Sequence, residues 1–167
     1  MGREVRMVPA DWKHPKEFNQ YRGCDVFKPL LDGFSESLSE WKEGKEQWDR
    51  GLIRDYINEG WKPKPSGADY ETYEEWAGEC PKKEDYMPDW HDDQRTHYMM
   101  YEDTSEGTPI SPAFETPEDL ARWLTDTGAS SFGDSTATYE QWLRVAKGGY
   151  APSAVLVGGK IISGVEF

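Results

Sequence analysis

The sequence has few cysteines, no long apolar run and no concentration of basic residues. Cys24 and Cys80 are the only two cysteines, too few for a disulfide framework. No stretch approaches the roughly 18 consecutive apolar residues that a membrane-spanning helix requires. The first six residues, 1–6, also lack the apolar segment of a signal peptide. We therefore expect a cytoplasmic protein that neither enters a membrane nor depends on disulfide bonds.

Basic residues are outnumbered, since 19 Lys and Arg stand against 32 Asp and Glu, which gives a net charge of -13. Binding to nucleic acid through phosphate contacts needs a clustered basic surface, so direct nucleic-acid binding is not expected. Hydrophobic residues are scarce at 36%, yet aromatic residues reach 14%, with 8 Trp and 9 Tyr. Disordered acidic segments are poor in aromatics. The composition therefore predicts a folded chain with an aromatic core, and its length suits a single domain over 1–167.

The negative charge is concentrated in the middle of the chain. Residues 1–68 carry 12 acidic and 12 basic side chains, and residues 120–167 carry four of each. Residues 69–119 carry 16 acidic and three basic side chains, so this section holds the whole excess. A solvated surface is one interpretation. The other is a surface for a basic partner, because charges of one sign at this density repel each other and lower stability.

Apolar spacing, capping residues and turn residues predict an α+β fold with long irregular loops. Several short helices would pack on a small antiparallel sheet that includes a C-terminal β-hairpin. We expect a loop over 16–33 and a linker over 62–67. The predicted helices span 37–50, 52–57, 70–77, 117–127 and 139–147. The predicted strands span 5–8, 96–101, 154–157 and 160–162.

No motif predicts a bound cofactor or metal. His91, Asp92, Asp93, His97 and Cys80 contain zinc-ligating residue types, but their spacing does not match known zinc sites. Neither cysteine has a local pattern that would link it to a catalytic histidine. Sixteen carboxylates in one section also produce many chance pairs, so no pair can be singled out for acid–base catalysis.

Most tryptophans follow helical apolar spacing and are expected in the core: Trp41, Trp48, Trp76, Trp123 and Trp142. Trp90 differs, because it stands among acids in the sequence Asp89-Trp90-His91-Asp92-Asp93. An aromatic ring next to carboxylates can recognise arginine or lysine, with the ring stacked on the cation and the carboxylates paired with it. The alternative is a local aromatic cluster that holds a long loop in place.

Four segments resemble small acidic proteins of tailed phages and prophages: Val5–Pro15, Tyr86–Trp90, Ser105–Pro112 and Tyr139–Leu143. The likeness covers both ends of the chain and the acidic middle, but not residues 40–80, and it carries no catalytic motif. It implies a bacterial cytoplasm during infection. In that setting such proteins often look like inhibitors of host defence, including anti-CRISPR and anti-restriction proteins that occupy a basic nucleic-acid groove.

The leading hypothesis is therefore a phage-encoded binding protein that inhibits a host nucleic-acid-acting defence complex by covering its basic surface. An enzyme is the less favoured reading. One alternative is a small nucleotide- or metal-binding enzyme or ligand sponge that uses His91 or His97. Another is an oligomeric phage structural or regulatory component, and the oligomeric state stays open. The predicted partner-binding residues are Asp89, Trp90, Asp92, Asp93, Glu102, Asp103 and Glu106.

Overall fold

The computed structural model describes residues 2–65, 67, 70–103 and 107–167, and it confirms the α+β fold. The chain forms two compact units. Unit 1 combines Met1–Leu30 with Asp89–Phe167, and unit 2 is Leu31–Pro88. No helix in the described ranges is long and apolar enough to cross a membrane. The expectation of a single domain over 1–167 stays a prediction.

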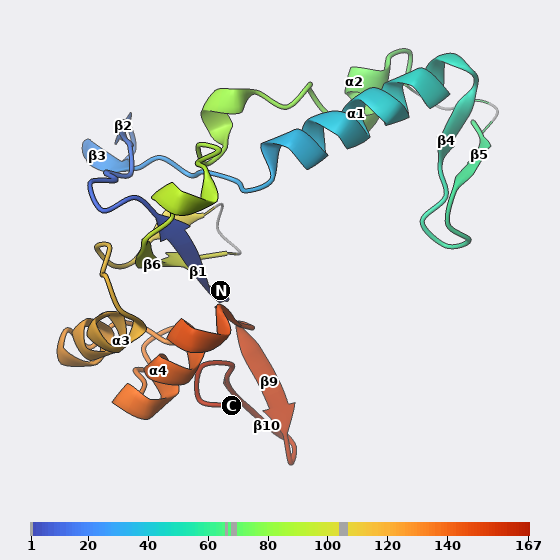
Figure 1. The fold of residues 1–167 in the computed structure, drawn as a ribbon. Helices are drawn as coiled ribbons and strands as arrows, with labels where there is room; N and C mark the ends of the chain where they lie inside the picture. The colour runs from blue at the N-terminus through green and yellow to red at the C-terminus, as the bar shows by residue number, and fades with distance from the viewer. Residues whose placement is uncertain (1, 66, 68–69, 104–106) are drawn as a thin grey trace. The chain divides into compact units, whose positions relative to one another are not determined.

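Four strands of unit 1, β1 (Arg3–Val8), β6 (His97–Glu102), β7 (Thr108–Pro109) and β8 (Tyr150–Ala151), form an antiparallel sheet in the order β7-β6-β1-β8, of which Figure 1 labels β1 and β6. The two longest strands, β1 and β6, pair along their whole length, and the predicted strands over 5–8 and 96–101 are confirmed. Val5 lies opposite Met100 in this register, so apolar side chains meet across the pair.

Two helices, α3 (Pro117–Asp126) and α4 (Tyr139–Gly148), pack against each other and against the sheet. Both begin where the sequence predicts. The Thr116 hydroxyl accepts a hydrogen bond from the Asp119 N–H, and Thr138 forms a capping box with Gln141. Their apolar faces complete the core of unit 1 with Met100, Leu120, Leu124, Trp142 and Val145.

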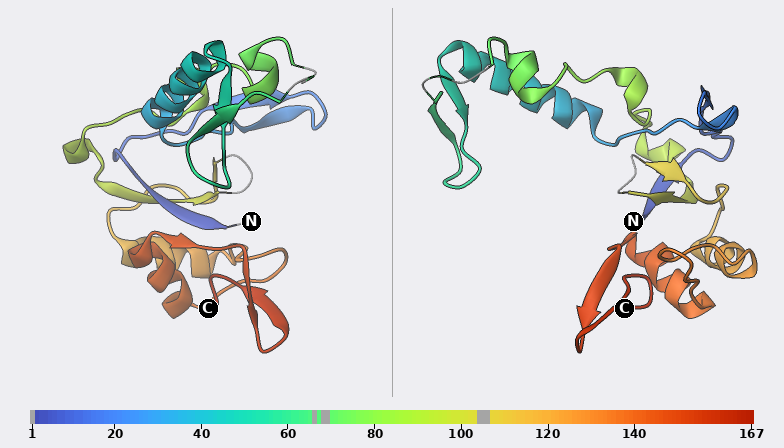
Figure 2. Two further views of the ribbon diagram at one scale, coloured as in Figure 1. Left: turned by 90° about the vertical axis from the view of Figure 1, so that its right-hand side faces the viewer. Right: turned by 180° about the vertical axis from the view of Figure 1, so that it is seen from behind.

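Two β-hairpins also belong to unit 1. The C-terminal hairpin, β9 (Ala154–Val157) and β10 (Lys160–Ser163), is confirmed and forms a two-stranded sheet of its own. Gly158 and Gly159 have φ of 56° and 81°, as a two-residue primed turn requires. The chain end after β10 lies beside α4, where Arg144 donates to the Val165 carbonyl (Figure 2).

The loop predicted over 16–33 is wrong in part, because the second hairpin of unit 1 lies there. Strands β2 (Lys16–Asn19) and β3 (Cys24–Phe27) form an antiparallel pair. The Asn19 side chain accepts hydrogen bonds from the backbone N–H groups of Tyr21 and Arg22, which stabilises the turn. Both strands are largely exposed, so they lack the apolar alternation that reveals a strand in a sequence.

Unit 2 contains a long helix, a hairpin and a short helix. The long helix begins at Phe34 and not at the predicted Ser37, because Gly33 takes a left-handed conformation (φ 74°) and starts it without a side-chain cap. The elements are α1 (Phe34–Asp49), β4 (Leu52–Arg54), β5 (Trp61–Pro63), α2 (Tyr73–Ala77) and the 3₁₀ turn η1 (Lys83–Asp85).

The helix predicted over 52–57 is wrong, since β4 and β5 form a hairpin there. Asp55 accepts hydrogen bonds from the side chain of Asn58 and from the backbone N–H groups of Ile57 and Asn58. These bonds, led by the one from the Asn58 side chain, lower the Asp55 pKa to about 2. The turn chemistry of Asp55 therefore overrides the helical spacing of the apolar residues around it. The residues predicted as a linker over 62–67 begin inside β5.

Candidate functional site

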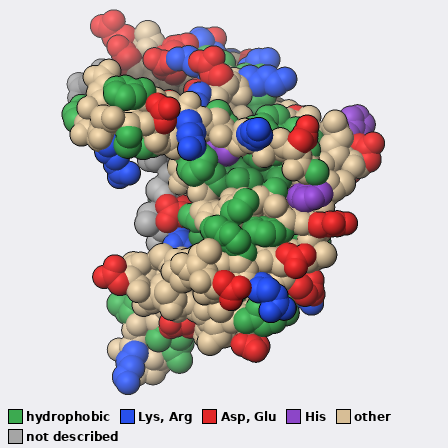
Figure 3. Space-filling model, turned by 90° about the vertical axis from the view of Figure 1, so that its left-hand side faces the viewer, with side chains coloured by type: hydrophobic (Ala, Val, Ile, Leu, Met, Phe, Trp, Pro, Cys, Tyr) green, Lys and Arg blue, Asp and Glu red, His purple; other side chains and the backbone are tan. Residues whose placement is uncertain are grey.

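The acidic section 69–119 is divided between the two units, because the boundary falls between Pro88 and Asp89. Unit 1 carries a net charge of -6, and unit 2, with 15 acidic and eight basic side chains, carries -7. On the face drawn in Figure 3, acidic side chains are scattered among basic and apolar ones. Each unit therefore carries part of the negative charge.

In unit 1 the first part of the predicted binding set forms an exposed acidic loop. Asp92 and Asp93 lie in the 3₁₀ turn η2 (Asp92–Gln94), and both side chains are exposed. Asp89 is also exposed and lies 3.5 Å from the Arg95 guanidinium. The Gln94 side chain accepts a hydrogen bond from the His91 N–H and closes the turn. The loop is thus ordered locally while two carboxylates face solvent.

Trp90 is half-buried and anchors this loop to the body of unit 1. Its ring meets the Trp12 ring edge-on, with centroids 4.8 Å apart. The Trp12 indole N–H donates to the Tyr101 hydroxyl at 3.2 Å. Tyr101 is fully buried, and burial raises its pKa to about 12, so the phenol stays protonated. Trp90 is therefore held by contacts that lead directly to strand β6.

His14 completes this aromatic network. Its Nε2 lies 2.6 Å from the Lys28 carbonyl oxygen, which can only accept, so Nε2 carries the proton. Its Nδ1 faces the Tyr101 hydroxyl at 3.2 Å. Burial lowers the His14 pKa, the bond to the Lys28 carbonyl opposes this, and the Arg6 cation adds to the lowering. His14 thus joins the Lys28 carbonyl to the Tyr101 hydroxyl, and sequence analysis did not identify it because a lone histidine has no spacing signal.

The second part of the predicted set lies at the other end of β6 and contacts a buried arginine. Glu102 lies 3.3 Å from the guanidinium of Arg3, whose side chain is 1% exposed. Asp103 adds to the negative potential at Arg3. A strand of this length separates these acids from the loop by about 17 Å. Glu102 is therefore engaged inside unit 1, and Glu106 falls outside the described residues.

The structure does not gather the candidate metal ligands. Within the described ranges no group of three or more His, Cys, Asp or Glu side chains is placed to hold a metal ion. His91 is exposed in the loop, whereas His97 lies in β6 with its Nδ1 2.9 Å from the Thr96 hydroxyl. Both cysteines are exposed, with Cys24 in unit 1 and Cys80 in unit 2.

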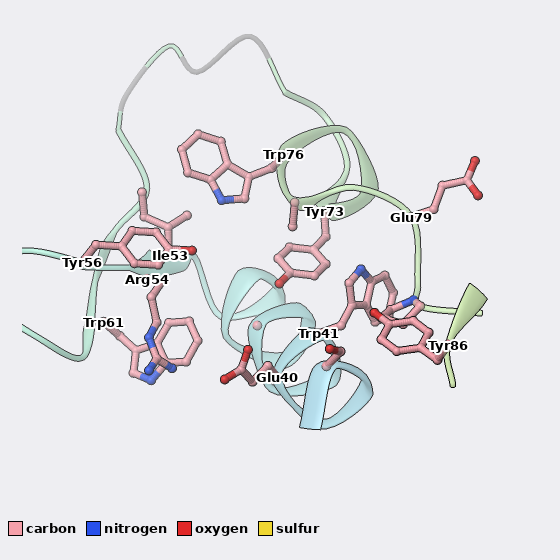
Figure 4. A pocket seen from close by; sticks show the side chains of 14 residues that line it. Glu40, Trp41, Ile53, Arg54, Tyr56, Trp61, Tyr73, Trp76, Glu79 and Tyr86 are labelled. Atoms are coloured by element: carbon pink, nitrogen blue, oxygen red, sulfur yellow. The ribbon is translucent and has the colours of Figure 1, made fainter. Parts of the chain in front are cut away.

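Unit 2 contains a second candidate site, a cavity of about 700 Å³ bordered by α1, α2, the β4–β5 hairpin and the segment around Tyr86 (Figure 4). Glu40, Arg54 and Glu79 are the charged side chains of its lining. The Glu79 carboxylate points away from the rings in Figure 4 and pairs with Lys82 at 2.7 Å. Six aromatic side chains dominate the lining: Trp41, Tyr56, Trp61, Tyr73, Trp76 and Tyr86.

Close packing between α1 and α2 fixes the back of the cavity. The Tyr73 hydroxyl lies against Gly44 in the middle of α1, where a Cβ atom would collide with it. The Tyr73 ring makes edge contact with Trp41, at 5.3 Å between centroids, and the Trp41 indole N–H donates to the Gly78 carbonyl. Burial raises the Tyr73 pKa, and the nearby Tyr56 phenol adds to this. These contacts hold two rings of the lining in place.

Two cations of unit 2 already rest on tryptophan faces. The Arg54 guanidinium lies 5.3 Å from the centre of the Trp61 ring and 3.8 Å from the Glu43 carboxylate. The Lys64 ammonium lies 3.6 Å from the centre of the Trp48 ring. Both distances are within the range of attractive cation–π contacts. The aromatic surfaces of unit 2 are therefore suited to positive charge.

The sequence-based prediction was wrong for two tryptophans of unit 2. Trp41 and Trp76 were expected in the core, but both border the cavity, and Trp76 is 39% exposed. Trp48 and Trp142 are buried as predicted. One sequence signal for this close packing was available, because Gly44 lies in the interior of a helix. Glycine lowers helix stability there, so its presence suggests that another residue packs closely against the helix.

Comparison with known proteins adds no further assignment, because no family model, curated protein or solved structure matches the chain.

Proposed function

We propose that this protein is an acidic binding protein that covers a basic surface of a nucleic-acid-acting complex, in the manner of a phage-encoded inhibitor of host defence. The observation that carries the proposal is the ordered acidic loop of unit 1. Its two exposed carboxylates, Asp92 and Asp93, follow Trp90 closely in the chain, and the Trp90 ring is already packed on Trp12.

An anchored aromatic ring that is followed in the same loop by exposed carboxylates favours binding of arginine and lysine side chains. The ring is ordered before binding, so little conformational entropy is lost when a partner docks. Opposite charges speed the encounter and orient the partner, while a central aromatic residue commonly supplies much of the binding energy. Glu102 and Asp103 are left out of this surface, because they balance the charge of Arg3.

The proposal is tested by inhibition of DNA cleavage in a panel of purified CRISPR effector and restriction complexes. We expect the protein to inhibit at least one of them, with inhibition relieved by added DNA and by salt. The double variant Asp92→Lys, Asp93→Lys should lose inhibition, because both carboxylates would become cations facing a basic surface. Its stability should stay within about 0.5 kcal/mol of the parent, as is usual for exposed positions.

A matched control reverses two exposed acids elsewhere in unit 1, Glu115→Lys and Glu140→Lys, which changes the net charge equally. Inhibition that survives in the loop variant, or that is lost equally in both variants, would contradict docking through the loop. A complete lack of inhibition across the panel would contradict the anti-defence assignment itself.

A further inference from the structure

The cavity of unit 2 keeps aromatic surface that the fold does not use. Tyr56 is 87% exposed and Trp76 is 39% exposed, although both border the cavity. Trp76 stacks on the buried Trp48, at 6.1 Å between centroids, and Tyr70 meets it edge-on at 5.3 Å, so these contacts hold its ring in place. A ligand that entered the cavity would therefore find aromatic surface that is both accessible and partly immobilised.

The charge of the lining disfavours an anionic ligand such as a nucleotide. Among the described lining residues Arg54 is the only lysine or arginine, and it is already engaged by Trp61 and Glu43. A phosphate would thus meet a unit of net charge -7, and the described part of the lining offers it no available cation. Glu40, in contrast, has an exposed carboxylate on the lining and no ion-pair partner in the described part of the chain.

Exposed aromatic rings and an exposed carboxylate in one cavity together favour a ligand that is cationic and flat. A guanidinium group stacks on aromatic faces and presents five N–H donors in a plane, whereas an ammonium group is a compact and strongly hydrated charge. The chain itself shows the arrangement, since the Arg54 guanidinium lies over Trp61 with a carboxylate beside it.

We infer that the unit 2 cavity is a binding site for an arginine side chain of a partner protein. The guanidinium stacks on the exposed aromatic surface of Tyr56 and Trp76, and the Glu40 carboxylate accepts its N–H groups. This site lies entirely in unit 2 and does not depend on the acidic loop of unit 1.

The test is a titration of the full chain with two peptides, followed through the indole N–H signals of its eight tryptophans by NMR. The probes are acetyl-Gly-Arg-Gly-amide and the same peptide with citrulline, which keeps the planar shape of arginine but is uncharged. Four tryptophans report on unit 2: Trp41, Trp48, Trp61 and Trp76. The other four belong to unit 1: Trp123 and Trp142 serve as internal references, whereas Trp12 and Trp90 report on the acidic loop.

We expect the arginine peptide to shift the signals of Trp76 and Trp61, and the citrulline peptide to bind several-fold more weakly. The Tyr56→Ala variant should weaken arginine binding about threefold, the size of an exposed cation–π contact. The Glu40→Gln variant should weaken it about two- to fivefold, the size of an exposed ion pair. Controls are Tyr21→Ala, a fully exposed tyrosine of unit 1, and Glu36→Gln, an exposed acid of α1 outside the lining.

Equal binding of the citrulline peptide would overturn the inference, as would equal losses in the variants and their controls. Stronger shifts with uridine monophosphate than with the arginine peptide would assign the cavity to nucleotides instead. Shifts confined to Trp12 and Trp90 would place arginine recognition on the acidic loop and not in the cavity. That last result would leave the proposed docking of the loop intact, so the two proposals fail separately.

Discussion

The two units have the same number of tryptophans and nearly the same net charge, yet they use their aromatic residues differently. Among the described residues, 13 buried hydrophobic side chains belong to unit 1 and only four to unit 2. In unit 1, Trp142 and Tyr101 are fully buried within or beside the sheet. In unit 2, most rings border an open cavity of about 700 Å³. Aromatic content alone therefore does not distinguish a core from a binding surface.

The largest expected effect comes from truncating one tryptophan in each unit. Trp142→Ala should lower the free energy of unfolding by about 3–5 kcal/mol, because it empties a fully buried site. Trp76→Ala should lower it by about 1 kcal/mol, because its ring is partly exposed already. Amide hydrogen exchange resolved by residue measures each unit separately. Similar losses for both variants would contradict the contrast between the units.

The second prediction separates structural acids from exposed ones in unit 1. Glu102→Gln should destabilise unit 1 by about 2 kcal/mol, because it removes charge that balances the buried Arg3. Asp92→Asn should change the stability by less than about 0.5 kcal/mol, since this carboxylate is exposed. Urea unfolding followed by circular dichroism compares the two. If Asp92→Asn were the more damaging variant, the division of the predicted binding set would be wrong.

The third prediction concerns Gly44. Helix propensity alone predicts that Gly44→Ala stabilises α1 by up to about 1 kcal/mol. The structure predicts the opposite sign, a loss of about 1–2 kcal/mol, because the new Cβ atom would displace Tyr73 from the wall of the cavity. Ser39→Ala, at an exposed position of the same helix, is the matched control and should be close to neutral. A stabilised Gly44→Ala variant would show that Tyr73 does not hold this position.

The smallest effect is a pH dependence centred on His14. Because its pKa is lowered in the folded state, the unfolded chain binds the proton more readily. Stability should be full above the unfolded pKa of about 6.5 and should decrease as the pH falls from there towards the folded pKa. Arg6 and Tyr101 face the imidazole, and neither can stabilise its cation by charge, since one is cationic and the other a neutral phenol.

His14→Gln provides the comparison for this pH dependence, because it keeps a donor for the Lys28 carbonyl but cannot titrate. Thermal unfolding at a series of pH values between 5 and 7.5 measures the effect. A variant whose melting temperature falls as steeply as that of the parent over this window would exclude His14 as the titrating group.

The parts of the fold that sequence predicts are those with local signals. Thr116 and Thr138 mark helix starts, and Gly158-Gly159 marks a hairpin turn, because capping and turn chemistry act within a few residues. The helix predicted over 52–57 is wrong because hydrogen bonds to the Asp55 side chain favour a turn, although the apolar spacing there fits a helix. The hairpin formed by β2 and β3 was missed because its strands are exposed and have no buried face.

The candidate sites were predictable only in part. The acidic loop around Trp90 is contiguous in sequence, so its composition revealed it. The separation of Glu102 from that loop follows from strand β6 and from Arg3, 99 positions earlier in the chain, and neither is a local property. The cavity gathers residues from α1, α2 and the β4–β5 hairpin, and such a convergence is not visible in apolar spacing, which assigns Trp41 and Trp76 to a core.

Solvent exchange of the eight indole N–H groups, resolved by NMR, tests the contrast between the units most directly. The Trp142 indole N–H is buried and has no hydrogen-bond partner among the described residues, so it should exchange only when unit 1 unfolds. The indole N–H groups of Trp61 and Trp76, on the wall of the cavity, should exchange rapidly in the native state. Protection of Trp61 and Trp76 equal to that of Trp142 would show that the cavity is closed, and would contradict the assignment of unit 2 as the open aromatic site.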